Sequence, residues 1–347
     1  MKTIFYSSRL CNIPGVFYPT TVLSVDDDNI AIDAVIAALA GQYKVISFLD
    51  SNKALDFLTD KTGRFFRGRV ISNKIEDGVL GFRKEVYNNQ RFDDVMIAII
   101  DYDMPAKSGF DVWQNVGLND YRQSHEHSYI LFTAKKYSDF QEELANEAIG
   151  KNFISKFDPN HPKYLIEAVN KLSTAMFQRV GHGIANMLNH DESEKTSFLN
   201  DGNFLPILNP YLDEHEICEG YLFDKQGSLM FLDSKANLSW LFVRNEQGVI
   251  NSIERARTYG APDSVLACLK SKDKILSLYE KEDFESRKSI DWNKYLLKAD
   301  VFKDEGKKLE VFENRPSDYY YAFTDIFPEH GIDKDKILSY DAFLRQK

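Results

Sequence analysis

The chain has 347 residues, of which 43% are hydrophobic, and a formal net charge of −10. A chain of this length should hold two domains, and its acidic balance argues against a nucleic-acid surface. No apolar run approaches the roughly 18–20 residues that span a bilayer. No signal-peptide pattern opens the chain, and three scattered cysteines favour free thiols in a reducing compartment. We therefore expect a cytoplasmic protein without a membrane segment.

Acidic residues follow the first predicted strand. The buried-strand run Thr21–Val25 leads directly into Asp26, Asp27 and Asp28. Like charges at a strand end repel unless a cation lies among them, and carboxylate oxygens suit Mg²⁺. A helix, a strand and a second helix are expected next, over 29–40, 43–48 and 52–58. The buried face of the first helix is expected to carry Ile32, Val35, Ile36 and Leu39.

An insert of about 30 residues, 61–92, separates the second helix from the next strand. It is rich in basic residues, at Lys61, Arg64, Arg67, Arg69, Lys74, Arg83, Lys84 and Arg91. Apolar residues with helical spacing predict an amphipathic helix over 76–88, at Val79, Leu80, Phe82 and Val86. Two interpretations stay open. The insert is a docking surface for an anionic partner, or a helical elaboration whose arginines pair with the acidic remainder of the chain.

Asp101 follows the apolar run Val95–Ile100. Six apolar residues before a turn are typical of a buried parallel strand. A carboxylate at the C-terminal end of such a strand lies where open α/β sheets place their chemistry. Pro105 and Gly109 predict a loop that keeps this carboxylate accessible. By itself, the segment is equally consistent with an aspartate that only caps a strand.

Two later strands also end in polar residues. The run Ser128–Phe132 leads into Thr133, and the run Asn152–Ser155 leads into Lys156. Four strand ends therefore supply acids, a nucleophilic carboxylate, a hydroxyl and an amine, in that chain order. Each signal is weak singly, but together they predict one site at the edge of a parallel sheet.

This constellation resembles the receiver domain of bacterial two-component response regulators. The resemblance covers about residues 18–175 and implies a doubly wound five-stranded parallel sheet, with the receiver domain itself over 18–160. Asp101 matches the phospho-accepting aspartate of the D-x-x-M-P motif. Asp26 and Asp27 match the metal-binding acidic pair. All the core residues of the motif set are present, which favours an active receiver over a degenerate one.

The resemblance implies phosphoryl transfer to Asp101 from a sensor histidine kinase or a phosphotransfer protein. It implies Mg²⁺ held by Asp26, Asp27, Asp101 and the backbone of Asp103. Positioning and electrostatics would supply most of the catalysis.

Five further positions correspond to functional positions of that family. Thr133 matches the switch hydroxyl, Lys156 the phosphoryl-binding lysine and Phe153 the aromatic switch residue. Asp103 and Lys135 occupy positions that tune the lifetime of the phosphoryl group. One departure is Phe157, which follows Lys156 where the family usually has proline.

One long helix is predicted over 160–190. Its apolar stripe is Leu165, Val169, Leu172, Met176, Val180, Ile184 and Met187. A receiver needs about half that length for its fifth helix, so the remainder is expected to link to the second domain. The stripe is expected to pair in a homodimer on phosphorylation, as in a short coiled coil.

Residues 195–347 are expected to form an α+β output domain. Strands are predicted over 220–223, 228–232, 294–302, 308–313 and 318–323, and helices over 237–245, 252–259 and 263–281. This order, two strands, helices, then three strands, resembles a PAS-like fold by topology alone.

Two functions remain open for the whole chain. The first is a phosphorylation-controlled switch whose output domain binds a protein or a small ligand. The alternative is a response regulator whose output domain is an unrecognised enzyme, with a pocket built around His215 with Cys218 or Asp224. No turnover enzyme is identified beyond phosphoryl transfer to the receiver itself. From residue 176 onward there are 23 basic and 30 acidic residues, so DNA binding is not expected.

Overall fold

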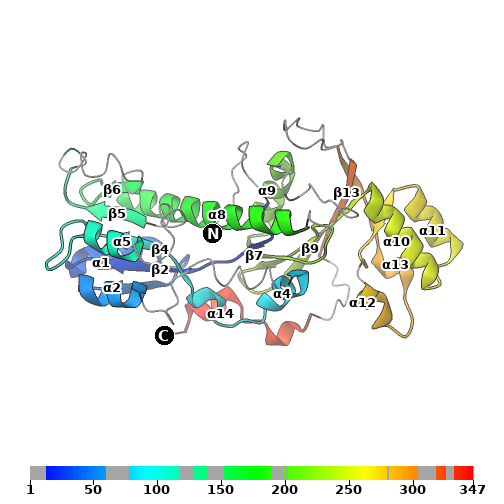
Figure 1. Cartoon of the computed structure of the whole chain (residues 1–347), viewed down its shortest axis with the longest axis horizontal. Helices are drawn as coiled ribbons and strands as arrows, with labels where there is room; N and C mark the ends of the chain where they lie inside the picture. Colours follow the sequence, from blue (N-terminus) through cyan, green and yellow to red (C-terminus); the bar gives the residue numbers. More distant parts are fainter. Residues whose placement is uncertain are drawn as a thin grey trace.

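The computed structural model describes residues 13–59, 78–117, 129–136, 138, 152–188, 199, 202–279, 281–303, 318–325 and 332–346. These residues form an elongated molecule with a parallel sheet at one end and an antiparallel sheet in the middle (Figure 1). A group of short helices lies at the other end, and one long helix runs beside both sheets. None of the described helices is both long and apolar enough to cross a bilayer.

The parallel sheet has five strands in the order β3-β2-β4-β5-β6. They are β2 (Thr21–Val25), β3 (Val45–Phe48), β4 (Val95–Ile100), β5 (Tyr129–Thr133) and β6 (Phe153–Ser155). All of their pairings are parallel. Numbered along the chain, the order is 2-1-3-4-5, a common doubly wound arrangement. The predicted five-stranded receiver-type sheet is confirmed.

Helices cover both faces of this sheet. On one face α1 (Asn29–Leu39) packs beside α8 (His161–Leu188), and on the other α2 (Ser51–Thr59) packs beside α5 (Gly109–Gly117). In α1, the predicted Ile32, Val35 and Leu39 are buried. Ile36 was expected with them but is 40% exposed. One residue beyond Val35, it is turned about 100° from the centre of the buried stripe.

Helix α8 is 28 residues long, as its apolar stripe predicts. The described stripe residues are all buried: Leu165, Val169, Leu172, Met176 and Ile184. They belong to the core of the same chain, packed against α1, β1, β4 and β6. The expectation that this stripe is free for a coiled-coil dimer is therefore wrong, because this chain already buries it. The side chains of Val180 and Met187 lie outside the described residues.

The antiparallel sheet has the order β1-β7-β8-β9-β13-β12. Its strands are β1 (Val16–Phe17), β7 (Ile217–Leu222), β8 (Leu229–Asp233), β9 (Leu238–Asn245), β12 (Asp300–Lys303) and β13 (Asp318–Thr324). Helix α9 (Leu205–Glu214) packs on β7. The predicted β7–β8 hairpin and the predicted last strand are confirmed.

The segment 237–245, expected to be a helix, is strand β9. All eight residues of β9 are buried, so apolar side chains are needed on both faces and no alternation marks the strand. Three strands therefore precede the helices, and the element order behind the PAS-like analogy is wrong. The predicted strand 308–313 lies outside the described residues.

Residues 246–298 form a helical lobe between β9 and β12. It contains α10 (Glu246–Thr258), α11 (Asp263–Lys270), β10 (Lys274–Leu276), α12 (Lys281–Glu285), α13 (Trp292–Tyr295) and β11 (Leu296–Lys298). The predicted helix 252–259 is confirmed within α10. The helix expected over 263–281 ends at Lys270, because Lys272 adopts a left-handed turn with φ of 62° and β10 follows. The lobe has a core of its own.

The insert contributes a helix, as predicted, but a shorter one: α4 (Gly78–Glu85). Phe82 and Val86 are buried, whereas Leu80 is 55% exposed. The helix packs on β7 of the antiparallel sheet. Arg83 donates a hydrogen bond to the carbonyl of Phe223, and Arg91 pairs with Glu219 on β7. Of the two arginines in the described part of the insert, Arg91 pairs with an acidic residue, as the second interpretation proposed, whereas Arg83 contacts the carbonyl and ring of Phe223. The other basic positions before residue 78 lie outside the described residues.

The N-terminal segment also joins the two sheets. Strand β1 pairs with β7, and the chain then enters β2 of the parallel sheet. The segment crosses α8 closely: a Cβ at Gly181 would lie 2.9 Å from the carbonyl oxygen of Ile13. One hydrophobic cluster runs from the α1–α8 face of the parallel sheet into the antiparallel sheet. The two sheets thus share a continuous core.

Candidate functional site: an acidic edge of the parallel sheet

Three carboxylates meet at the C-terminal edge of the parallel sheet. Asp26 follows β2 and Asp101 follows the neighbouring strand β4, while Asp27 lies one residue beyond Asp26. One ligand oxygen from each lies within 4.8 Å of the other two. Asp26 and Asp101 are buried and Asp27 is exposed. Parallel pairing is what brings together residues that are about 75 positions apart in sequence.

Lys156 extends into this group from the end of β6. Its Nζ lies 2.7 Å from Oδ2 of Asp26 and 3.1 Å from Oδ1 of Asp101. Burial raises the pKa of Asp26, although the hydrogen bond from Lys156 opposes that rise. Burial alone would lower the pKa of Lys156, but Asp26 and Asp101 raise it above its ordinary value. The lysine is therefore held as a positive charge beside the two buried acids.

Thr133 and Phe153 lie on the next two strands. Thr133 ends β5 and is 1% exposed. Its Oγ1 accepts a hydrogen bond of 3.3 Å from the backbone N–H of Lys135. Phe153 begins β6 opposite Leu131 and is half-buried. Thr133 therefore ends the strand next to β4, and Phe153 begins the strand that leads into Lys156.

Asp103 and Lys135 face each other at the mouth of the site. The Nζ of Lys135 lies 3.4 Å from Oδ1 of Asp103 and 4.8 Å from the ring centre of Tyr102. The backbone N–H of Asp103 donates to Oδ2 of Asp101. The exposed Asp103–Lys135 pair contributes little to stability. It does place one opposite pair of charges close to Asp101, to which the backbone N–H of Asp103 donates.

The loop after Asp101 depends on Gly109. A Cβ at this position would lie 2.1 Å from the carbonyl oxygen of Asp101, so no other residue fits without moving the backbone. The N–H of Gly109 donates to the carbonyl of Tyr102 and closes the loop. Ala106 adopts a left-handed conformation with φ of 70°. The sequence predicts the loop from Pro105 and Gly109 but gives no signal for the strained Ala106.

Two large apolar side chains that follow the strand ends of this site closely in sequence are exposed to solvent. Ile30, in the first turn of α1, is 77% exposed, and Phe157, next to Lys156, is 79% exposed. Ile30 was missed by the sequence analysis, which assigned only the buried stripe of α1. An apolar residue two positions after the acidic run at 26–28 is the signal that could have found it.

The acidic group fits a hard divalent cation. Carboxylate oxygens are the ligands that Mg²⁺ prefers, and it needs only one or two of them because it keeps several waters. Asp26, Asp27 and Asp101 supply three such carboxylates with one open to solvent. The predicted contribution of the Asp103 backbone stays a prediction.

The catalytic group considered for the output domain is not assembled. His215 stacks on Tyr211 at 4.0 Å between ring centres, while Cys218 is buried in β7 and its thiol pKa is raised by burial. Asp224 lies beyond the other end of β7 and pairs with Arg244 at 2.9 Å. These side chains therefore do not converge on one site.

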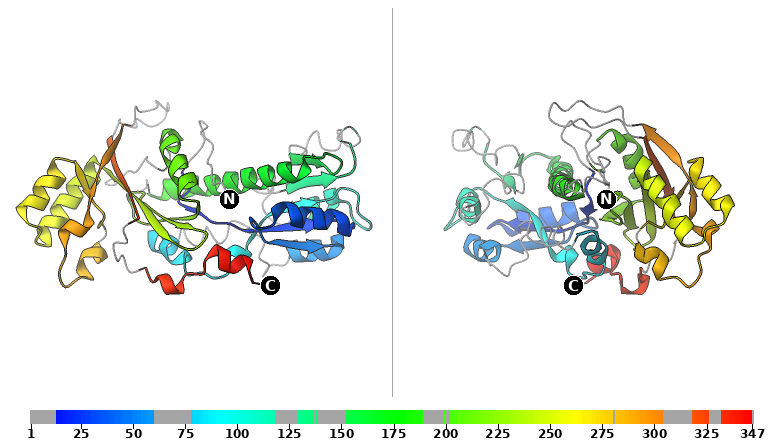
Figure 2. Two further views of the ribbon diagram at one scale, coloured as in Figure 1. Left: turned by 180° about the vertical axis from the view of Figure 1, so that it is seen from behind. Right: turned by 45° about the vertical axis from the view of Figure 1, so that its right-hand side comes forward.

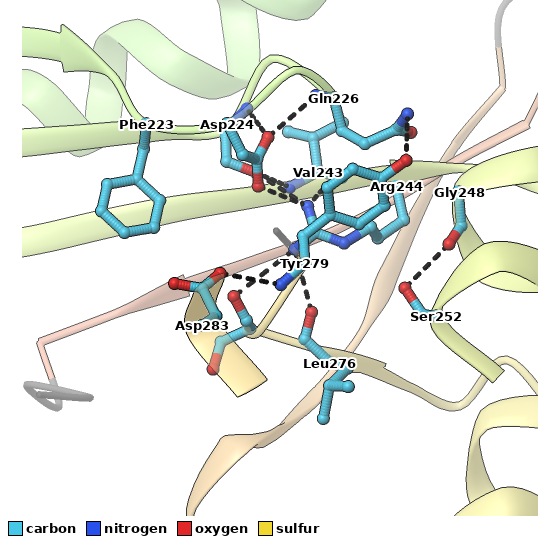
Figure 3. A network of polar contacts seen from close by, with 12 residues as sticks. Phe223, Asp224, Gln226, Val243, Arg244, Gly248, Ser252, Leu276, Tyr279 and Asp283 are labelled. Atoms are coloured by element: carbon cyan, nitrogen blue, oxygen red, sulfur yellow. Dashed lines mark hydrogen bonds and ion pairs between the residues drawn. The ribbon is translucent and has the colours of Figure 1, made fainter. Parts of the chain in front are cut away.

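Asp224 instead organises a buried polar network below the helical lobe (Figure 3). Its Oδ1 accepts from the N–H groups of Gln226 and Ser228 and fixes the β7–β8 turn. The guanidinium of Arg244 also donates to the carbonyl of Leu276 in the lobe. Gln226 donates to the hydroxyl of Tyr279. The network joins the hairpin to the lobe through Arg244 and Gln226, although Nε of Arg244 and Oε1 of Gln226 are buried without a hydrogen-bond partner among the described residues.

Comparison with family models and with curated proteins finds no match. Among solved structures, the Legionella pneumophila response regulator LqsR matches with a TM-score of 0.70 and 24% sequence identity, over 96% of each chain. The Vibrio cholerae chemotaxis protein CheY4 matches with 19% identity and a TM-score of 0.28, over 44% of this chain and 98% of that chain. That score is too low to support an argument. Over nearly its whole length the chain shares the fold of a response regulator, with a receiver fold in its N-terminal half and an antiparallel-sheet unit in its C-terminal half.

Proposed function

We propose that this protein is a phosphorylation-controlled signalling switch that accepts a phosphoryl group on Asp101. The observation that carries the proposal is the meeting of Asp26, Asp27, Asp101 and the ammonium of Lys156 at the C-terminal edge of a receiver-type sheet. Asp101 is assigned as the nucleophile because it directly follows the buried strand β4 within this group and matches the phospho-accepting position of the D-x-x-M-P motif. The phosphoryl donor is a sensor histidine kinase or a phosphotransfer protein.

In this proposal Asp26, Asp27 and Asp101 hold Mg²⁺, which neutralises charge on the phosphoryl oxygens when it is bound. Lys156 places a point charge beside the same oxygens, and the Thr133 hydroxyl donates to one of them. The new charge on Asp101 draws Thr133 toward it, and Phe153 turns inward behind it. Asp103 and Lys135 set the lifetime of the phosphoryl group because they lie at the entrance used by water.

The direct test is to incubate the protein with acetyl phosphate and Mg²⁺ and to measure its intact mass. We expect a gain of one phosphoryl group, located by peptide mapping to the segment that contains Asp101. An unchanged mass under conditions that phosphorylate a known receiver domain would contradict the proposal.

Loss of the Asp27 or the Asp101 carboxylate should weaken Mg²⁺ binding, whereas loss of the neighbouring Asp28 carboxylate should not. Asp27→Ala and Asp101→Ala each remove an oxygen ligand, and we expect Mg²⁺ affinity to fall by at least about tenfold. Asp28→Ala is the matched control. The Asp28 carboxylate caps α1 by accepting from Ile30, so its loss should cost about 0.5–2 kcal/mol of stability without changing the affinity. Titration calorimetry measures the Mg²⁺ affinity of each variant. An equal loss of affinity in Asp27→Ala, Asp101→Ala and Asp28→Ala would contradict the assignment of Asp27 and Asp101 as Mg²⁺ ligands.

We propose that the donor docks against the exposed apolar rim formed by Ile30 and Phe157. A histidine-bearing helix needs apolar contacts beside the acidic edge, and these are large hydrophobic side chains that follow its strand ends closely in sequence. Ile30→Ser and Phe157→Ser should slow transfer from the cognate kinase while leaving phosphorylation by acetyl phosphate unchanged, because the small donor needs no docking surface. Equally slow phosphorylation by the kinase and by acetyl phosphate would show that the substitutions damage the site itself.

Phosphorylation is also proposed to favour a homodimer through the last receiver elements. Because the stripe of α8 is buried, the contact must use its outer face, where Lys163 and Glu167 are exposed and Tyr164 is 39% exposed. Light scattering with beryllofluoride as phosphoryl mimic should show the mass double, and Tyr164→Glu should prevent this. A monomer mass at tens of micromolar, with the mimic bound, would refute the dimer. DNA is not among the proposed partners.

A further inference from the structure

The C-terminal segment 332–346, called here the C-terminal clasp, crosses the junction of the two sheets. Figure 2 shows its helix α14 (Tyr340–Leu344, red) at that junction. The hydroxyl of Tyr340 donates to the carbonyl of Gln42 in the α1–β3 turn, at 2.7 Å. The N–H of Asp341 donates to the carbonyl of Ser234 beyond β8, at 2.9 Å. Adjacent residues of the clasp thus bind one sheet each.

Aromatic packing holds the clasp in place. Phe92, just before β4, has its ring centre 5.1 Å from that of Tyr340 and 5.2 Å from that of Phe343. The ammonium of Lys44, just before β3, lies 4.6 Å from the ring centre of Phe343. Phe92, Tyr340 and Phe343 are at most 3% exposed. The clasp therefore completes a buried aromatic group rather than lying on the surface.

Arg91 provides a second connection between the clasp and the antiparallel sheet. The guanidinium of Arg91 donates to the carboxylate of Glu219 on β7, at 2.8 and 3.1 Å, and to the carbonyl of Leu338 in the clasp, at 2.7 Å. Arg91 and Glu219 are both fully buried. Tyr221 donates to the same carboxylate. Release of the clasp would leave this charged group short of a partner.

We propose that the C-terminal clasp fixes the receiver unit to the antiparallel sheet, so that the two sheets move as one body. Units joined within a chain are expected to move relative to each other unless their interface is large and apolar. Here the core is continuous, and Tyr340 and Phe343 of the clasp belong to it. The clasp, not only the linking helix, determines the arrangement.

This inference has a consequence that rests on the proposed function. The clasp and Arg91 lie at the N-terminal ends of β3 and β4, whereas Asp101 lies at the C-terminal end of β4. Phosphorylation then changes a surface far from the clasp and does not separate the units. The switch is read by a second molecule at the receiver edge.

Amide hydrogen exchange on the full chain tests the clasp. In the unaltered protein, the amides of β1, β7 and the α1–β3 turn should exchange only through global unfolding. Phe343→Ala removes the central ring of the clasp, and we expect those amides to exchange at least about tenfold faster than global unfolding allows. Tyr340→Phe deletes only the hydrogen bond to Gln42 and should give a smaller change in the same peptides. Tyr340→Phe remains a test of the clasp if the Phe343→Ala protein does not fold.

The matched control is Phe284→Ala in the helical lobe. Phe284 is 1% exposed and its ring stacks on Tyr259, so its loss should destabilise the protein to a similar extent. It should not open β1, β7 or the α1–β3 turn ahead of global unfolding. If Phe343→Ala and Tyr340→Phe expose only residues 332–346, the clasp does not join the units and the inference fails.

Beryllofluoride and Mg²⁺ added to the unaltered protein separate this inference from the proposed function. Slower exchange in 101–109 and 133–136, with no change in 217–222 and 338–346, supports both. Faster exchange in 217–222 and 338–346 would overturn the clasp while keeping the switch. Unchanged exchange in 101–109 would contradict the proposed function. The Phe343→Ala and Tyr340→Phe variants would then still test whether the clasp joins the two units.

Discussion

Asp101→Asn should abolish phosphorylation by acetyl phosphate. The amide keeps the shape of the side chain but is not a nucleophile, and it supplies a weaker ligand to the cation site. Lys156 retains its 2.7 Å contact with Asp26 in this variant, so the fold of the site should survive. Intact-mass measurement should show no gain for Asp101→Asn under conditions that modify the unaltered protein completely.

Two controls separate loss of the nucleophile from loss of the cation. Asp27→Ala retains the Asp101 carboxylate, so it should still be modified at high Mg²⁺, only more slowly. Asp101→Asn should stay unmodified at every Mg²⁺ concentration. A mass gain that persists in Asp101→Asn would mean that another residue accepts the phosphoryl group and that the assignment is wrong.

Arg91→Met should lower the free energy of unfolding by about 3–5 kcal/mol, because it leaves the buried carboxylate of Glu219 without its partner. Burial raises the pKa of Glu219 even with Arg91 beside it, which shows how poorly the site tolerates an uncompensated charge. The carbonyl of Leu338 loses a hydrogen bond as well. Urea denaturation followed by circular dichroism measures the change, which should appear as a lower midpoint.

The double variant Arg91→Met/Glu219→Met tests the reason for that loss. With both charges removed, no buried charge is unpaired, and stability should recover in large part. Recovery should be incomplete because the Tyr221 hydroxyl and the Leu338 carbonyl still lack their partners. If the double variant is as unstable as the sum of the two single variants, the residues act independently and the pair is not the cause.

Patterns in the sequence predicted most strands of the receiver fold and the polar residues at their ends. Val95–Ile100 was predicted to be a buried strand, because six apolar residues bounded by Asp101 and a turn leave no polar face, and the structure confirms it. The same local rule, a buried run ending in a polar residue, located Asp26, Thr133 and Lys156. Such signals are local in sequence, so one chain suffices to read them. The meeting of these residues at one edge followed from the parallel order of the strands.

The C-terminal half was harder to predict, because its signals are not local. Strand β9 was mistaken for a helix because its burial on both faces erases the alternation that marks a strand. The two-residue strand β1 has no pattern of its own and exists because β7 offers it hydrogen bonds. Ile36 was wrongly predicted to be buried, because apolar periodicity identifies the centre of a buried helix face but not which residues at its edges are exposed.

By itself, the sequence determined the buried strands and the candidate residues at their ends, since each depends on a short run of neighbouring residues, and the resemblance to receiver domains added the doubly wound order of the sheet. Only the tertiary structure decided what Arg91 of the basic insert contacts. Arg91 meets Glu219 across 128 positions and Leu338 across 247, and no spacing rule connects residues so distant. A buried charge needs a partner wherever the fold can bring one. The joining of the two units therefore depends on contacts that arise only when the whole chain has folded.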